Sequence, residues 1–133
     1  MRQREIAVSF LVLSQELTAE EIGHRLQLSP RSSRAIGEDR GTLLESRSNV
    51  WEYFVDFDPS EALDDVVLRT LGELARYRDK LLALRDVADL VVWCAVFSNT
   101  PQTTVSLSSG CIAAVADFGA AFDCKVYATD FED

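Results

Sequence analysis

Six carboxylate side chains form the densest group of chemically active residues in the sequence. They are Glu52, Asp56, Asp58, Glu61, Asp64 and Asp65, and no lysine or arginine interrupts them. Such a concentration of negative charge attracts basic surfaces and speeds their association. Acids near a helix start also interact favourably with the helix dipole, which is a purely structural reason for their presence. We predict a binding surface for a basic protein here, rather than paired-carboxylate hydrolysis, because the sequence indicates no cleft.

A second group combines positive charge with hydroxyls in the polar segment 29–49, which we predict to be a long loop. Its candidate anion-binding residues are Arg31, Ser32, Arg34 and Arg40. Guanidinium groups beside hydroxyls are suited to phosphate or carboxylate ligands. No phosphate-binding loop motif accompanies them, and Glu38 and Asp39 offer partners within the same loop. This loop carries the alternative hypothesis of a small-molecule or anion-binding domain, with enzymatic activity left open.

The remaining reactive side chains favour structural roles. His24 is the only histidine, which excludes a multi-histidine metal site, and Glu20 one turn earlier supplies no third ligand. We expect a solvated pair on a helix surface and no metal or cofactor. Cys111 near a helix start occupies a position where the dipole favours a thiolate, but residues 112–115 indicate packing and no base is identifiable. We predict no catalytic residue and favour a non-enzymatic protein.

Length and charge set the broad class. The chain has 133 residues, 47% of them hydrophobic, which suits one domain over 1–133 with a single core. A net charge of −9 disfavours nucleic-acid binding, which depends on basic side chains. The longest apolar run, 90–97, is too short to span a bilayer, and we expect no membrane association. Three widely spaced cysteines and no secretion signal predict a cytoplasmic protein with reduced thiols.

Hydrophobic periodicity places the elements that must position these groups. It predicts strands at about 5–13, 51–57, 88–98, 103–107 and 122–129, and helices at about 19–27, 59–85 and between Ser108 and Gly119. Thr18 and Glu21 form a capping box, and Asp58 with Pro59 is a plausible start for the second helix. The order β-α-loop-β-α-β-β-α-β predicts an α+β fold: a two-layer sandwich of a mostly antiparallel sheet with helices, in which an extra β-α unit precedes a ferredoxin-like βαββαβ element.

The predicted strand 88–98 is apolar on both faces. A strand of this kind is usually covered on both sides. Because helices are expected to cover only one face, we also hypothesise a homodimer in which a second subunit covers the other face.

Three segments together resemble a family of small bacterial domains of unknown function, DUF4279. They are the opening strand with Leu-Thr-Ala-Glu-Glu-Ile-Gly-His-Arg-Leu-Gln-Leu-Ser-Pro (17–30), Val-Trp-Glu-Tyr-Phe-Val (50–55) and Val-Ser-Leu-Ser through Val-Tyr (105–127). The family has no assigned reaction, so the resemblance implies no catalytic residue. Some members of such families occur beside toxins, so the resemblance implies a possible immunity role. The six carboxylates would suit such a protein to a basic toxin. Relatives usually carry a glycine-aspartate turn before the first helix, where this chain has Ser14-Gln15-Glu16.

Overall fold

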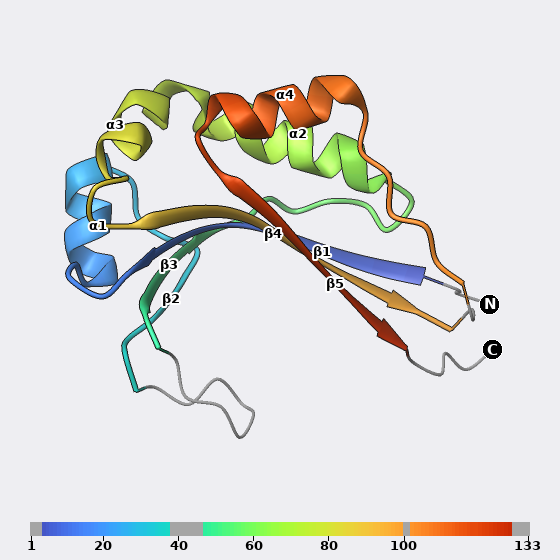
Figure 1. The fold of residues 1–133 in the computed structure, drawn as a ribbon, viewed down its shortest axis with the longest axis horizontal. Coiled ribbons are helices and arrows are strands. Elements are labelled where there is room, and N and C mark those ends of the chain that lie inside the picture. Colours follow the sequence, from blue (N-terminus) through green and yellow to red (C-terminus); the bar gives the residue numbers. More distant parts are fainter. Residues whose placement is uncertain (1–3, 38–46, 100–101, 129–133) are drawn as a thin grey trace.

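A five-stranded sheet with helices over one face forms the molecule in the computed structural model, which describes residues 4–37, 47–99 and 102–128 (Figure 1). The strands are β1 (Arg4–Ser14), β2 (Ser32–Arg34), β3 (Asn49–Tyr53), β4 (Asp89–Ser98) and β5 (Ala121–Ala128). The helices are α1 (Ala19–Leu26), α2 (Leu63–Leu74), α3 (Arg78–Ala83) and α4 (Ser109–Asp117), with a 3₁₀ turn at Ala75–Tyr77. This confirms the predicted α+β class.

The strand order β2-β3-β1-β4-β5 contains the βαββαβ element at the start of the chain. Neighbouring strands β2, β3, β1 and β4 are antiparallel, so β1 and β2 are parallel with β3 between them, and β3 and β4 are parallel with β1 between them. This is the split βαβ arrangement. The prediction of an extra β-α unit in front is therefore wrong: the extra unit is α4 with β5, and β5 is parallel to β4.

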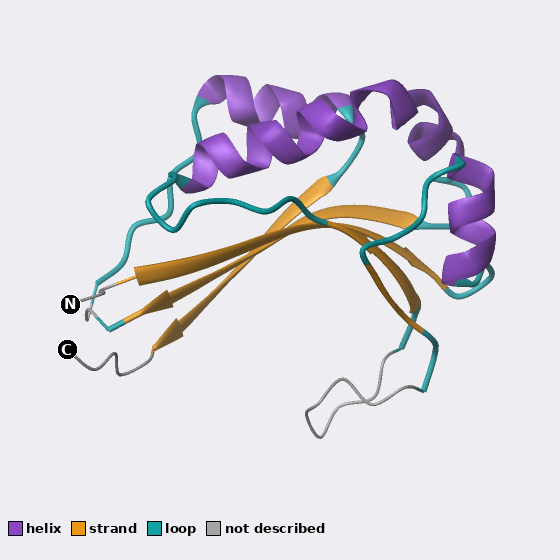
Figure 2. Cartoon of the chain, turned by 180° about the vertical axis from the view of Figure 1, so that it is seen from behind, coloured by secondary structure: helices purple, strands orange, loops and turns teal. Residues whose placement is uncertain are grey.

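The two faces of the sheet have different surroundings. Phe10, Val12, Trp51 and Cys94 lie on the face that packs against the helices, which we call the core face. In both views the helices lie on this side of the arched strands (Figures 1 and 2). The opposite face, the open face, carries the alternate residues, and on β4 these are Val91, Trp93, Ala95 and Phe97. The predicted two-sided apolar strand is thus present, and no described helix covers its second face.

Local capping explains where two helices begin. The Thr18 side chain accepts from the Glu21 amide at 3.1 Å, and the Glu21 carboxylate accepts from the Thr18 amide at 3.1 Å. This confirms the predicted capping box. Ser108 caps α4 by accepting from the Cys111 amide at 3.1 Å. Gly119 follows α4 with a φ of 64°, a backbone conformation that favours glycine. The helix thus ends just before this glycine, as predicted.

The predicted helix 59–85 begins later and is interrupted. The Asp58 side chain bonds the Ser60 amide at 2.9 Å, and the Glu61 carboxylate accepts from the Asp58 amide at 2.8 Å. These bonds close a turn of their own, and Ala62 then adopts an extended conformation. The helix therefore starts at Leu63, and the 3₁₀ turn separates α2 from α3. None of the described helices reaches the length and apolarity needed to cross a bilayer.

Two strand predictions also change. Residues 103–107 form no strand, although Val105 and Leu107 pack against the core, because β5 occupies the position beside β4. The predicted loop 29–49 contains the three-residue strand β2, which pairs with β3. The predicted strand 51–57 corresponds to β3, which ends at Tyr53 while Val55 stays buried in the core.

Candidate functional site

The six predicted acidic residues are distributed between the end of β3 and the first turn of α2, and we call this segment the acidic edge. Glu52 lies within β3, Asp56, Asp58 and Glu61 lie in the connection to α2, and Asp64 and Asp65 lie in the first turn of α2. Asp56, Asp58 and Asp65 are exposed, whereas the other three are half-buried. The edge therefore consists of two kinds of carboxylate, three that face solvent and three that contact the fold more closely.

Glu61 holds the turn before α2 together. Its carboxylate pairs with Arg69, whose second guanidinium nitrogen bonds Glu61 at 3.1 Å and the Asp56 carbonyl at 2.7 Å. The hydrogen bond from Arg69 is the main reason that the pKa of Glu61 lies below its usual value, with the Asp58 amide as the next cause. The chain around Asp58 is therefore fixed by contacts of Glu61 and by the bonds from Ser60 to the Asp58 carboxylate, which itself lies at the surface.

Asp64 joins the start of α2 to the start of α4. Its carboxylate accepts from the Ser108 amide at 2.7 Å and from the Ser108 hydroxyl at 2.9 Å. The amide bond chiefly lowers the pKa of Asp64. Cys111 lies beside the same aspartate, and burial followed by the Asp64 charge raises the pKa of its thiol to about 11. The helix-dipole effect considered for Cys111 is thus outweighed, and the thiol is protonated at neutral pH.

Glu52 and Asp56 connect the acidic edge to other parts of the molecule. Glu52 accepts a hydrogen bond from the Ser9 hydroxyl, on the open face. Asp56, whose side chain is 95% exposed, pairs with Arg31 at 3.5 Å between the guanidinium and carboxylate groups. Arg31 also lies over the Phe54 ring at 4.9 Å. One predicted anion-binding residue is therefore the partner of one predicted acidic residue.

The other predicted anion-binding residues are only partly brought together. Ser32 and Arg34 are half-buried on β2, opposite Glu52 and Val50 of β3 in the register. Arg40, together with Glu38 and Asp39, lies outside the described residues. Of the two described arginines of this predicted site, Arg34 thus lies on the open face, and Arg31 is paired with the Asp56 carboxylate.

His24 and the other cysteines occupy the positions expected for structural residues. The imidazole of His24 lies 3.9 Å from the Glu20 carboxylate, and both side chains are exposed. Burial raises the pKa of Cys94 to about 12, and burial also raises that of Cys124. Among the described residues, no group of three histidine, cysteine or acidic side chains could hold a metal ion.

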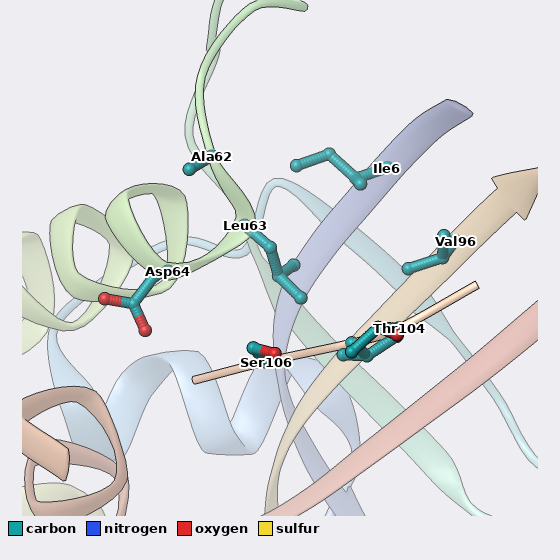
Figure 3. A pocket seen from close by; sticks show the side chains of 8 residues that line it. Ile6, Ala62, Leu63, Asp64, Val96, Thr104 and Ser106 are labelled. Carbon is teal, nitrogen blue, oxygen red and sulfur yellow. The ribbon is translucent and has the colours of Figure 1, made fainter. Parts of the chain in front are cut away.

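A pocket that the sequence did not indicate adjoins Asp64. It has a volume of about 250 Å³ and is lined by Ile6, Ala62, Leu63, Asp64, Val96, Thr104, Val105 and Ser106 (Figure 3). Residues 104–106 line it from a segment without regular secondary structure, where the sequence predicts a strand. No sequence signal could reveal it, since alternation at 103–107 is the same in both arrangements.

Family comparison agrees with the resemblance seen in the sequence. The family model described as "Domain of unknown function (DUF4279)" matches residues 4–129. The chain belongs to the DUF4279 family. No curated protein and no solved structure matches it.

The structure explains how this DUF4279 member turns into α1 without the glycine-aspartate pair. The Ser14 hydroxyl accepts from the amides of Glu16 and Leu17 at 3.1 and 3.0 Å and donates to the Val87 carbonyl at 2.7 Å. Ser14 is buried, so its side chain satisfies the backbone of the turn from inside. The Ser14 hydroxyl therefore holds the turn into α1 in this chain.

Proposed function

We propose that this protein is a non-enzymatic binding module that accepts a basic protein on the acidic edge. The observation that supports this most directly is that the six carboxylates differ in their bonds and in their exposure. Glu61 and Asp64 bond to Arg69 and Ser108 and fix the turn. Asp58 and Asp65 are exposed on it, although Asp58 also accepts from Ser60 within the turn. Charges held in fixed positions by their surroundings lose less entropy on binding than charges on a flexible segment.

Electrostatics favour a basic partner over an acidic one. The protein carries a net charge of −9, and the segment from Glu52 to Asp65 contains no cationic residue of its own. Arg31 and Arg69 are the cations paired with it among the described residues, against six carboxylates. A negative potential therefore remains there, which would steer a cationic surface into contact and weaken as salt is added.

Immunity to a basic toxin is the specific role that we propose for this binding. It rests on the family resemblance and on the charge of the edge, because an inhibitor of a cationic nuclease or other basic toxin needs an acidic surface and no reaction of its own. We place this activity in the cytoplasm, since the three cysteines are free in the described structure, in agreement with a reducing compartment.

The test is partner capture with charge-matched variants. Wild-type protein and the Asp58→Lys/Asp65→Lys double variant are immobilised, and cell lysate is passed over each at low and moderate salt. The control is Glu20→Lys/Asp86→Lys, which changes the net charge equally at exposed sites away from the edge. We expect a basic protein to be retained by wild type and control and lost by the edge variant. Equal retention by all three, or equal loss in both variants, would contradict the assignment.

The alternative of an anion site in segment 29–49 receives less support from the geometry. Arg31 already contacts Asp56 and Phe54, so an incoming anion would have to displace a carboxylate. Arg34 and Ser32 remain as the described residues on which such a site would depend. Loss of binding of a small anion such as inorganic phosphate in Arg34→Ala, with the edge variant unaffected, would favour this alternative.

A further inference from the structure

Strand β5 has properties of an interaction edge. Among the described strands it pairs only with β4, so its other side presents backbone donors and acceptors along eight residues. Such an edge is a template for pairing with another strand. Its side chains are also poorly covered: Phe122 and Cys124 are half-buried, and Val126 on the core face is 52% exposed. Within the described part of the chain, both the backbone and the apolar side chains of β5 thus have less cover than those of its neighbour β4.

We propose that β5 pairs antiparallel with β5 of a second copy of this chain, about a two-fold axis that passes beside Cys124. The pairing joins two five-stranded sheets into one continuous sheet. An axis perpendicular to the sheet is the symmetry that relates two identical antiparallel edge strands, and it makes the contact self-complementary. The helices of both copies then lie on the same side. This inference is independent of the proposed binding at the acidic edge.

Electrostatic interactions favour this register over registers in which the strands are shifted along one another. Asp123 and Lys125 are the only charged residues of β5 and point to the same face. With Cys124 at the axis, Asp123 lies opposite the partner's Lys125, and by symmetry Lys125 lies opposite the partner's Asp123. A shift that places Asp123 or Lys125 at the axis sets that residue opposite its own copy. Opposite charges across antiparallel strands stabilise the pair, and like charges destabilise it.

The apolar side chains agree with the same register. Exposed Val126 lies opposite the partner's Phe122 on the core face, so the part of β5 beyond α4 gains apolar cover. On the open face, Tyr127, stacked on Phe97 with ring centroids 5.0 Å apart, lies opposite the partner's Ala121. A large side chain therefore meets a small one at each end of the paired strands, which avoids a steric conflict.

A charge swap tests the register. The dissociation constant of the dimer is measured by sedimentation equilibrium for the full chain, for Lys125→Asp and for the double variant Asp123→Lys/Lys125→Asp. We expect Lys125→Asp to raise the dissociation constant about tenfold or more, because two attractive pairs become repulsive, and the double variant to restore dimerisation. Lys80→Asp on α3 is the matched control, since it makes the same charge change at an exposed lysine away from the edge. Circular dichroism checks that each variant is folded.

Oxidation supplies a second readout. Directly opposite residues of antiparallel strands have Cα atoms about 4.5 to 5.5 Å apart, within the range that a disulfide spans. We expect mild alkaline oxidation of wild type to give a dimer linked through Cys124, identified by peptide mapping, and Lys125→Asp to give much less of it. Three results would overturn the proposal: a monomeric wild type at all concentrations, a dimer indifferent to both charge variants, or a dimer broken by Trp93→Lys but not by Lys125→Asp, which would place the second copy on the open face.

Discussion

Asn49 is a buried polar side chain to which we expect the stability of the fold to be sensitive. Its Nδ2 donates to the Leu17 carbonyl at 2.9 Å, and its Oδ1 accepts from the Ile36 amide at 2.9 Å. The side chain therefore ties the start of β3 both to the entry of α1 and to the residues after β2. Asn49→Ala removes both bonds at once, with no local backbone change to compensate.

The cost follows from the surroundings of the two groups that lose their partner. Leu17 is buried, so its carbonyl would be left unsatisfied, which costs about 1 to 3 kcal/mol. Ile36 is exposed, so water can replace the lost acceptor and the cost is about 0.5 to 1 kcal/mol. We expect Asn49→Ala to lower the free energy of unfolding by about 1.5 to 4 kcal/mol in urea titration, and to lower Tm by about 5 to 14 °C for a chain of this length.

Two further variants make this prediction falsifiable. Asn99→Ala removes the same side chain from an exposed position and should cost no more than about 0.5 kcal/mol. Asn49→Asp keeps the acceptor for Ile36 but places a carboxylate against the Leu17 carbonyl, so its deficit relative to wild type should shrink as pH falls below about 4 and the group becomes a donor. A loss in Asn49→Ala below about 1 kcal/mol, or no different from that in Asn99→Ala, would refute the reasoning.

Three other predictions test the faces, the carboxylates and the thiols. In Trp93→Phe, the fluorescence of the remaining buried Trp51 should have a short emission wavelength and be quenched little by acrylamide. In Trp51→Phe, acrylamide should readily quench the fluorescence of the half-buried Trp93 on the open face. Equal quenching in both variants would contradict the assignment of the faces. The pKa of Asp64 is lower in the folded chain than its usual value of 3.8, so its stabilising effect is present above that pH and lost as pH falls through the folded value. Thermal unfolding scans should therefore show Tm falling in this acid range, less steeply in Asp64→Asn; equal slopes would show that Asp64 contributes nothing. In thiol titration of native protein, Cys124 should react before the two buried thiols, which should need unfolding; simultaneous reaction of all three would be inconsistent with the structure.

The sequence predicted elements whose signals are local. Strand β1 follows from a period of two and β4 from a run that is apolar on both faces. Helix α1 follows from the Thr18 and Glu21 side chains, because a cap and its helix lie within a few residues. Strand β2 is only three residues long and exists through its pairing with β3. Residues 103–107 alternate as a strand does, but β5 fills the position beside β4. Tertiary packing decides whether residues 103–107 or β5 pairs with β4 at the edge of the sheet, and hydrophobic periodicity carries no information about that choice.

The candidate site was predictable as composition but not as geometry. The run of acids between Glu52 and Asp65 is visible in the sequence, and so are the arginines of the alternative site in segment 29–49. The bonds that divide the acids into structural and exposed groups join Glu61 to Arg69 and Asp64 to Ser108. Such pairs depend on how α2 meets its neighbours, so only the folded chain could distinguish them.

The contact between Arg31 and Asp56 means that a variant at either position alters both candidate sites at once. Reversal of Asp56 would leave Arg31 without its carboxylate and so improve the arginine site while weakening the acidic edge. Alanine at Arg31 would expose more negative charge at the edge. Either change would move both activities in opposite directions. Asp58 and Asp65 on one side and Arg34 on the other have no such shared contact among those described, and the decisive comparison must therefore be made with them.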